Sequence, residues 1–243
     1  MSLTVKRTKH IITATVNRPE ARNAVNFDLM ERLEKLLDEL EADKEVRLFV
    51  LTGSGDSFIS GGDLREFHQL KKADEAKQMT SRMIEILDRI ENLPCWTLAA
   101  VNGYAYGGGW ETLLVFDFRV AKQSAKIGFT QGKFYLPPGW GGISRLTKTV
   151  GRDAALYWLA SQKVIRADEA LRSGLIQDIF KDESYQKDVD ALSERLVLND
   201  RAFIEYVKSS QSHNDIADEI EPFSRFWESD EHLKRVDAFL SRK

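Results

Sequence analysis

Residues 102–117 (NGYAYGGGWETLLVFD) combine a run of glycines with a nearby carboxylate. Glycines 107–109 permit backbone conformations and close approaches that a Cβ atom would forbid. If a helix begins there, its first N–H groups lack partners within the helix and point outward with the positive end of the dipole. Glu111 would then lie about one turn inside that helix. This arrangement suits reactions in which an oxygen gains negative charge while a base moves a proton.

A second glycine turn has a similar composition. In residues 58–64 (FISGGDL), Gly61 and Gly62 are followed by Asp63. Neither glycine run is a phosphate loop, because no Gly-Lys-Ser/Thr follows. Taken alone, a glycine turn more often only shapes the chain. Glu111 alone would more often be a first-turn carboxylate that the helix dipole favours.

The elements that must position these turns alternate between apolar runs and amphipathic segments. We expect strands at 11–16, with a hairpin partner at 4–9, and at 47–52, 96–101, 117–121 and 126–130. We expect helices from a cap at Asn26, at 74–92, at 143–150 after the turn 136–142, and at 154–161, 167–174 and 185–198. The alternation predicts an α/β fold, and the chain is expected to be mainly helical from Arg152 onward. The one expected boundary lies near Asp182, between residues 1–182 and a helical region, 183–243.

Composition indicates an ordinary globular protein of 243 residues, with net charge −3 and pI near 5.9. We therefore expect neither a nucleic-acid nor a membrane partner. A single cysteine, Cys95, excludes an internal disulfide, and its setting predicts a packed thiol rather than a nucleophile. The first ten residues lack a signal-peptide core, so a cytoplasmic location is expected. The four histidines lack metal-ligand spacing, so we expect no metal site. Only His68 is expected near the site; the other three are His10, His213 and His232.

Five segments, in this order and at these distances, resemble the crotonase (enoyl-CoA hydratase/isomerase) superfamily. They are NRPEARNA (17–24), FISGGDL (58–64), NGYAYGGGWETLLVFDFRVA (102–121), PGWGGISRL (138–146) and ADEALRSGLI (167–176). The resemblance implies a spiral of ββα turns in two near-perpendicular sheets. It also implies C-terminal helices that join trimers, often paired into hexamers. The substrate would be an acyl-CoA thioester, with no cofactor, since coenzyme A belongs to the substrate.

The resemblance also assigns roles to residues. It implies that the N–H groups of Gly62 and Gly108 hold the thioester oxygen and that Glu111 is catalytic. For coenzyme A it implies a binding set of six residues: Arg22, Ala24, Ser60, Gly61, Asp63 and Leu64. Four aromatic residues are candidates for an acyl pocket, although core packing is favoured for any one alone: Trp110, Phe134, Tyr135 and Trp140.

One position departs from the family pattern. Hydratases of the family carry a second glutamate, and the alignment places Gln131 there, where an amide is neither a general base nor a general acid. A single carboxylate suffices to decarboxylate a malonyl-type CoA, with Gln131 contacting the departing carboxylate. Residues 117–129 and 138–142 also look similar to the ethylmalonyl-CoA decarboxylase branch. We therefore expect a lyase, with decarboxylation slightly ahead of hydration and isomerisation third. The alternative from another class is a non-catalytic acyl-CoA-binding or scaffold protein.

Overall fold

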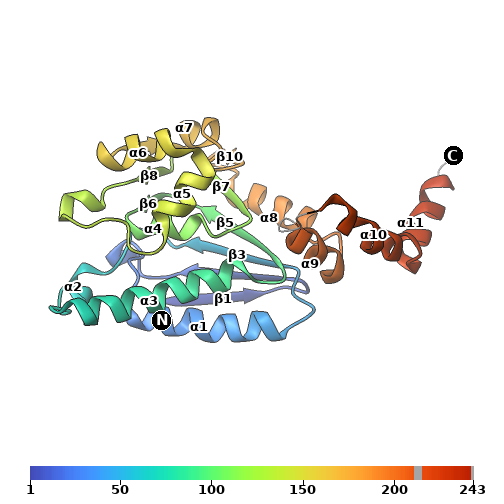
Figure 1. Ribbon diagram of the computed structural model, residues 1–243, viewed down its shortest axis with the longest axis horizontal. Coiled ribbons are helices and arrows are strands. Elements are labelled where there is room, and N and C mark those ends of the chain that lie inside the picture. The colour runs from blue at the N-terminus through green and yellow to red at the C-terminus, as the bar shows by residue number, and fades with distance from the viewer. Residues whose placement is uncertain (211–214, 242–243) are drawn as a thin grey trace.

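The computed structural model describes residues 1–210 and 215–241, and places ten strands in two sheets. Adjacent strands of the larger sheet are, in order, β1 (Leu3–Arg7), β2 (Ile11–Val16), β3 (Leu48–Gly53), β5 (Trp96–Val101), β7 (Phe118–Lys122) and β10 (Asp178–Phe180). The smaller sheet contains β4 (Ser57–Ile59), β6 (Tyr104–Tyr106), β8 (Lys126–Gly128) and β9 (Val164–Arg166). The chain repeats one pattern three times, in the pairs β3–β4, β5–β6 and β7–β8. In each pair the first strand joins the larger sheet and the second joins the smaller sheet, and a helix follows. This repeat is the predicted ββα spiral (Figure 1).

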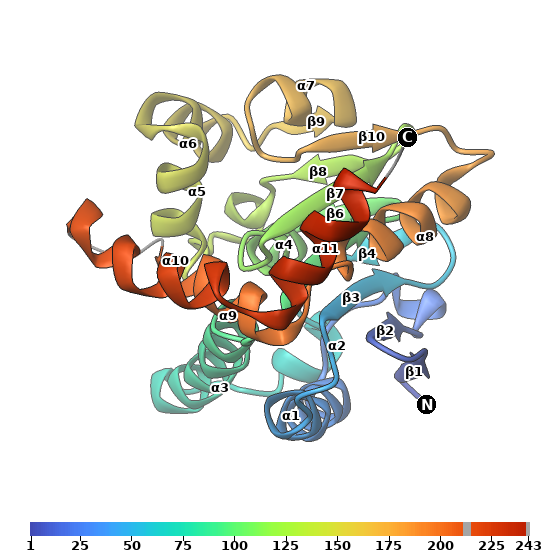
Figure 2. The ribbon, with the colours of Figure 1, turned by 90° about the vertical axis from the view of Figure 1, so that its right-hand side faces the viewer.

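The larger sheet is buried on both faces. Phe49 and Leu51 of β3 belong to the core cluster that includes α1 (Phe27–Ala42) and α3 (Ala73–Glu91). Leu48 and Val50 point into a second cluster, which includes Val189 of α8 (Tyr185–Leu196). Alternate side chains of a strand point to opposite faces, so a continuous apolar run suits a strand covered on both sides. Figure 2 shows α1 and α3 on one side of the sheet and α8 on the other.

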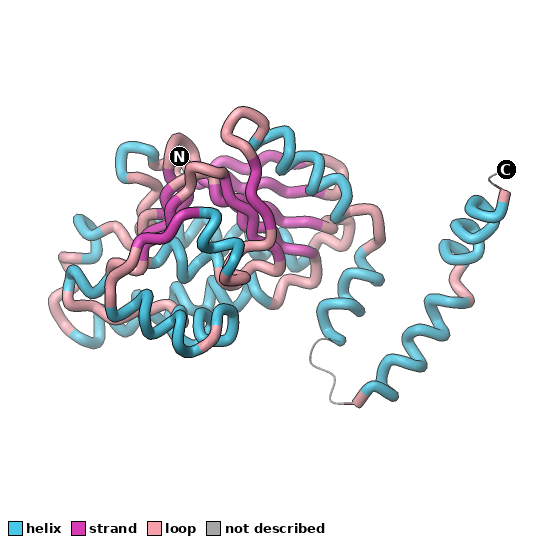
Figure 3. The backbone as a smooth tube through the Cα atoms, turned by 90° about the horizontal axis from the view of Figure 1, so that it is seen from above, coloured by secondary structure: helices cyan, strands magenta, loops and turns pink. Residues whose placement is uncertain are grey.

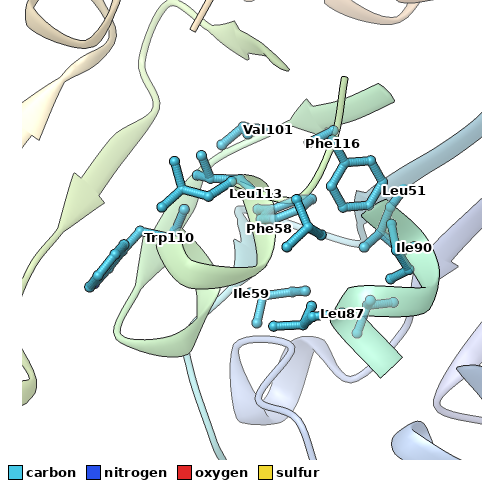
Figure 4. Packing of buried hydrophobic residues seen from close by; sticks show 14 of the residues in the cluster. Leu51, Phe58, Ile59, Leu87, Ile90, Val101, Trp110, Leu113 and Phe116 are labelled. Carbon is cyan, nitrogen blue, oxygen red and sulfur yellow. The ribbon is translucent and has the colours of Figure 1, made fainter. Parts of the chain in front are cut away.

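The predicted glycine-led helix forms at the centre of the molecule. Helix α4 (Gly108–Leu113) begins after Gly107, whose φ is 54°, and all of its residues are buried. Trp110 and Leu113 of α4 lie close to Phe58 and Ile59 of β4 (Figure 4). Four further helices cover this region: α2 (Leu64–Phe67), α5 (Gly142–Val150), α6 (Arg152–Ala160) and α7 (Ala167–Arg172).

The C-terminal region is helical, as expected, but two short strands precede it. Strands β9 and β10 lie in the part that we expected to be mainly helical, and β4 and β6 were not expected either. Each of these strands has three residues, which give only a weak alternating pattern, and β8 is the one strand of that length that was expected. Helix α9 (Arg201–Ser210) is fastened to the sheets through Lys208, whose Nζ lies 2.7 Å from Asp117 Oδ2 and 3.0 Å from the carbonyl oxygen of Cys95. Helices α10 (Ile220–Trp227) and α11 (Asp230–Leu240) extend away from the sheets (Figures 1 and 3).

Cys95 is fully buried, and burial raises the pKa of its thiol to about 11, which confirms a packed thiol. Among residues 1–210 and 215–241, no group of three or more His, Cys, Asp or Glu side chains is placed to hold a metal ion. No helix in the same ranges is both long and apolar enough to cross a membrane. His213 lies outside the described residues.

The contact between α4 and β4 predicts that Gly109→Ala is destabilising. A Cβ at position 109 would lie 1.8 Å from the carbonyl oxygen of Ile59, a backbone atom that cannot move aside alone. We expect a loss of about 2 kcal/mol in the free energy of unfolding, measured by urea denaturation. Gly139→Ala is the control, because its added Cβ would meet only Thr80 Oγ1, at 3.9 Å. Equal stabilities of the two variants would contradict the packing described.

Candidate active site

The two glycine turns meet, as the family resemblance implied. A Cβ on Gly61 would lie 3.2 Å from the amide nitrogen of Gly108, so the two backbones are in direct contact. Gly61 has a φ of 101°, a left-handed conformation that favours glycine. Within the described part of the chain, neither the Gly62 N–H nor the Gly108 N–H donates a hydrogen bond. The turns therefore present two neighbouring backbone donors that are free to bind an anionic oxygen.

Glu111 lies one turn into α4 and is only 2% exposed. Its Oε2 accepts hydrogen bonds from the backbone N–H groups of Trp140, at 2.8 Å, and Gly142, at 3.0 Å. Its Oε1 accepts one from the side-chain amide of Gln131, at 3.0 Å. Burial raises the pKa of the Glu111 carboxyl above its usual value, although these hydrogen bonds oppose the rise. The site thus holds a buried carboxylate with an increased affinity for a proton.

Gln131 is placed beside Glu111, where the alignment predicted it. Its Oε1 accepts a hydrogen bond of 3.0 Å from the Trp110 indole N–H, while its Nε2 donates to Glu111. Trp110 is fully buried, so this pair of bonds fixes the orientation of the amide. Gln131 therefore acts as a fixed, neutral donor to Glu111 and has no proton to exchange near neutral pH.

The NRPEARNA loop lies next to the first glycine turn. The Val25 N–H donates to the Gly61 carbonyl at 2.8 Å, and the Asp63 N–H donates to the Val25 carbonyl at 2.7 Å. Asn23, which is fully buried, donates to the backbone carbonyls of Ser54, at 2.9 Å, and Ser57, at 2.6 Å. These bonds position the segment that the resemblance assigns to coenzyme A.

The predicted coenzyme A residues divide into exposed and anchoring groups. Arg22 and Leu64 are exposed, and Arg22 adopts a left-handed backbone conformation with φ 51°. Asp63 is buried instead, where it pairs with Arg18 at 2.7 Å and caps α2. Ala24 is buried, and its carbonyl accepts a hydrogen bond from the Arg18 guanidinium. Ser60 is half-buried and donates to the backbone at 3.4 Å.

Sequence reasoning missed Arg18 and Asn23 as the residues that hold this loop. Both stand in the quoted NRPEARNA motif, but a side chain that bonds to a distant backbone leaves no periodic signal.

The four aromatic candidates for the acyl pocket divide into two buried and two exposed residues. Trp110 and Trp140 are buried, whereas Phe134 is 60% exposed and Tyr135 is 98% exposed, so the packing expected for those two was wrong.

The separation of Phe134 and Tyr135 from the core has a local cause. A 3-10 turn, Gln131–Phe134, is followed by Tyr135 in a left-handed conformation with φ 56°, and this sequence of conformations leaves both side chains exposed. His68 follows α2 and is exposed, with its Nε2 3.0 Å from Lys71 Nζ.

The raised pKa of Glu111 predicts a pH dependence of stability. A folded state with a raised carboxyl pKa binds the proton more tightly than the unfolded chain does. The stability that this adds is fully present below the usual glutamate pKa, about 4.3, and is lost as pH rises through the folded pKa. The side chain of the Glu111→Gln variant cannot ionise, so this variant does not lose stability in the same way. The difference in the free energy of unfolding, variant minus parent, should therefore increase as pH rises above the usual glutamate pKa, and urea denaturation at several pH values measures it. Glu183→Gln, an exposed carboxyl, is the control, and a parallel rise in that variant would contradict the assignment to Glu111.

Known proteins resemble this chain over nearly its whole length. A model of the enoyl-CoA hydratase/isomerase family matches residues 6–233. A short-chain-enoyl-CoA hydratase of Clostridium acetobutylicum is 29% identical over 241 residues, which cover 96% of this chain and 92% of that protein. A crotonyl-CoA hydratase of Syntrophomonas wolfei is 29% identical over 250 residues, which cover 100% of this chain and 96% of that protein.

Solved structures agree with the sequence relatives. The crystal structure of an enoyl-CoA hydratase from Bacillus anthracis superimposes with a TM-score of 0.91 at 26% identity, covering 100% of this chain and 97% of that one. An enoyl-CoA hydratase from Mycobacterium smegmatis gives a TM-score of 0.92 at 26% identity, with the same coverage of both chains. These matches confirm the fold that the sequence resemblance implied. The similarity to the decarboxylase branch stays a prediction.

Proposed function

The chain belongs to the enoyl-CoA hydratase/isomerase family, and from this premise we propose that it adds water to a short-chain enoyl-CoA thioester. The observation that carries the proposal is the buried carboxylate of Glu111 next to two unpaired backbone donors, Gly62 and Gly108. Such donors stabilise an oxygen that gains charge, and a removed donor typically costs about 3 kcal/mol in the transition state. The hydratase names of the relatives support the same reaction.

In the proposed reaction, Glu111 removes a proton from water as the water oxygen bonds to the β carbon of the enoyl group. The electrons of the double bond move toward the thioester, and Gly62 and Gly108 hold the enolate oxygen. Protonated Glu111 then returns the proton to the α carbon, which regenerates the carboxylate. A raised pKa suits this double role, because the same group must accept and release a proton. Gln131 keeps Glu111 oriented throughout.

This ranking reverses the one drawn from sequence, which put decarboxylation slightly ahead of hydration. The relatives' names favour hydration, and one carboxylate is sufficient if it first accepts and then donates the proton.

We also propose that the reaction needs no metal or redox cofactor, because proton transfer and oxyanion stabilisation supply its chemistry. The reaction is proposed to take place in the cytoplasm. The exposed Arg22 is proposed to contact the phosphates of coenzyme A, since guanidinium pairs well with phosphate.

Decarboxylation of a malonyl-type CoA is the second candidate, and Gln131 is the observation that favours it. A neutral amide beside Glu111 leaves one ionisable group, and loss of CO2 forms the enolate without removal of a carbon-bound proton. Isomerisation is the least favoured reaction, because it relies on a carboxylate at the position of Gln131. A non-catalytic role has less support, since a scaffold would have little need for a buried carboxylate beside two free donors.

Incubation with three thioesters, followed by mass spectrometry, separates these reactions. Crotonyl-CoA should gain the mass of water, whereas methylmalonyl-CoA and ethylmalonyl-CoA should be unchanged. Glu111→Ala should lower the hydration rate by at least about a hundredfold, because the base is lost. Glu183→Ala should keep the parent's rate. Loss of CO2 from either malonyl-type thioester would instead support decarboxylation, and a parent that converts none of the three would support the non-catalytic class.

The C-terminal helices support a further part of the proposal, self-association as a trimer or a dimer of trimers. Val236, Phe239 and Leu240 make one stripe on α11, and the last two are 70% and 71% exposed. A helical stripe of this kind normally packs against another surface. Residues 183–243 are accordingly proposed as the oligomerisation region, although α8 and α9 also pack on the sheets.

Sedimentation velocity at micromolar concentration tests the oligomer. We expect a species of three or six chains for the parent, and a shift toward monomer for Phe239→Asp, because a charge in an apolar contact is costly to bury. Lys234→Asp is the matched control, since it places the same carboxylate on the opposite side of α11. A monomeric parent would contradict the proposal.

A further inference from the structure

The indole of Trp140 lies against both glycines whose N–H groups are unpaired. A Cβ on Gly108 would lie 2.0 Å from Cζ3 of the indole, and a Cβ on Gly62 would lie 3.6 Å from its Cζ2. These separations place the six-membered ring in contact with Gly108 and beside Gly62. Trp140 is 6% exposed and belongs to the main core cluster, so the ring is a packed wall of the site.

The backbone of the same residue contacts the other half of the site. The Trp140 N–H donates to Glu111 at 2.8 Å, while its carbonyl accepts a hydrogen bond of 3.2 Å from Arg145 Nη1. Arg145 also donates from Nε to Glu91 of α3 at 2.9 Å, which fastens the turn to that helix. Hydrogen bonds to the N–H and to the carbonyl of Trp140 thus hold the backbone from which the indole extends.

An acyl group bound at this site must share space with that ring. If its thioester oxygen accepts the Gly62 and Gly108 N–H groups, the acyl chain begins beside the indole, because the ring lies against both glycines. Each further methylene then needs volume that Trp140 fills, and packed interiors do not yield such volume without strain. We infer that Trp140 limits the site to acyl groups of about the size of crotonyl or butyryl and is the residue that sets chain length. The inference rests on the proposed function, through the assignment of the two glycines to the thioester oxygen.

Binding of saturated thioesters tests this without depending on catalysis. Butyryl-CoA and octanoyl-CoA have neither a double bond to hydrate nor a carboxylate to lose, and isothermal titration calorimetry gives the ratio of their affinities. The parent should prefer butyryl-CoA. Trp140→Ala should change the ratio in favour of octanoyl-CoA by about fourfold for each methylene that becomes buried, or tenfold and more in total.

Two further variants isolate the effect of the indole at this position. Trp96→Ala is the matched control, because Trp96 packs against Phe118 on the α8 side of the larger sheet, and it should keep the parent's ratio. Trp140→Phe removes part of the ring while retaining an aromatic core residue, so it should fold even if the alanine variant does not. Its ratio should lie between those of the parent and Trp140→Ala, with circular dichroism reporting the fold of each variant.

The outcomes separate this inference from the proposed reaction. A parent that binds both thioesters equally, or an unchanged ratio in the folded position-140 variants, would overturn the role of Trp140. If the parent prefers butyryl-CoA but hydrates no enoyl-CoA, the lack of turnover refutes hydration. A changed affinity ratio in the position-140 variants would still support the role of Trp140 in setting chain length. A parent that binds no acyl-CoA would overturn both.

Discussion

Direct contact between two stretches of backbone is the constraint on which the site depends. Strand β4, which leads into the turn at Gly61 and Gly62, approaches the start of α4 so closely that a Cβ on Gly109 would lie 1.8 Å from the carbonyl oxygen of Ile59. Only residues without side chains permit that approach. Because the turns come from separate ββα repeats, β4 and β6 must pair before the two donors can be neighbours. The spiral fold is therefore the means by which two peptide N–H groups, distant in sequence, come to serve one oxygen.

A third segment, the turn 138–142, completes the site by a different kind of contact. It wraps around the carboxylate with its own N–H groups, from Trp140 and Gly142, and so keeps a negative charge in a buried place. Burial and hydrogen bonding act in opposite directions on the Glu111 pKa, and burial prevails. Arg145 links this turn to α3, so the helix that covers the larger sheet also supports the environment of the base.

Much of the fold was predictable, because long elements leave periodic signals. The cap at Asn26, the stripe of α1 and the buried strand β3 were all indicated by residue type and spacing. Strands β4, β6, β9 and β10 were missed, since three residues give only a weak alternating pattern; β8, of the same length, was expected within a longer β-like run. At the site, glycines and Glu111 were identifiable from the motifs, whereas the anchoring roles of Arg18 and Asn23 depend on contacts across the fold. Phe134 and Tyr135 were misjudged because composition alone does not show on which side of a tight turn a ring lies.

Trp140 acts on the base through its peptide group and on the acyl space through its side chain. Every amino acid except proline carries the same peptide N–H, so the hydrogen bond to Glu111 does not depend on which side chain stands there. Substitution at this one position can therefore alter which thioesters fit while the support of the carboxylate is inherited unchanged. The two properties belong to separate parts of one residue, so a replacement that still fills the core can change the range of substrates while it keeps the backbone hydrogen bond to the base.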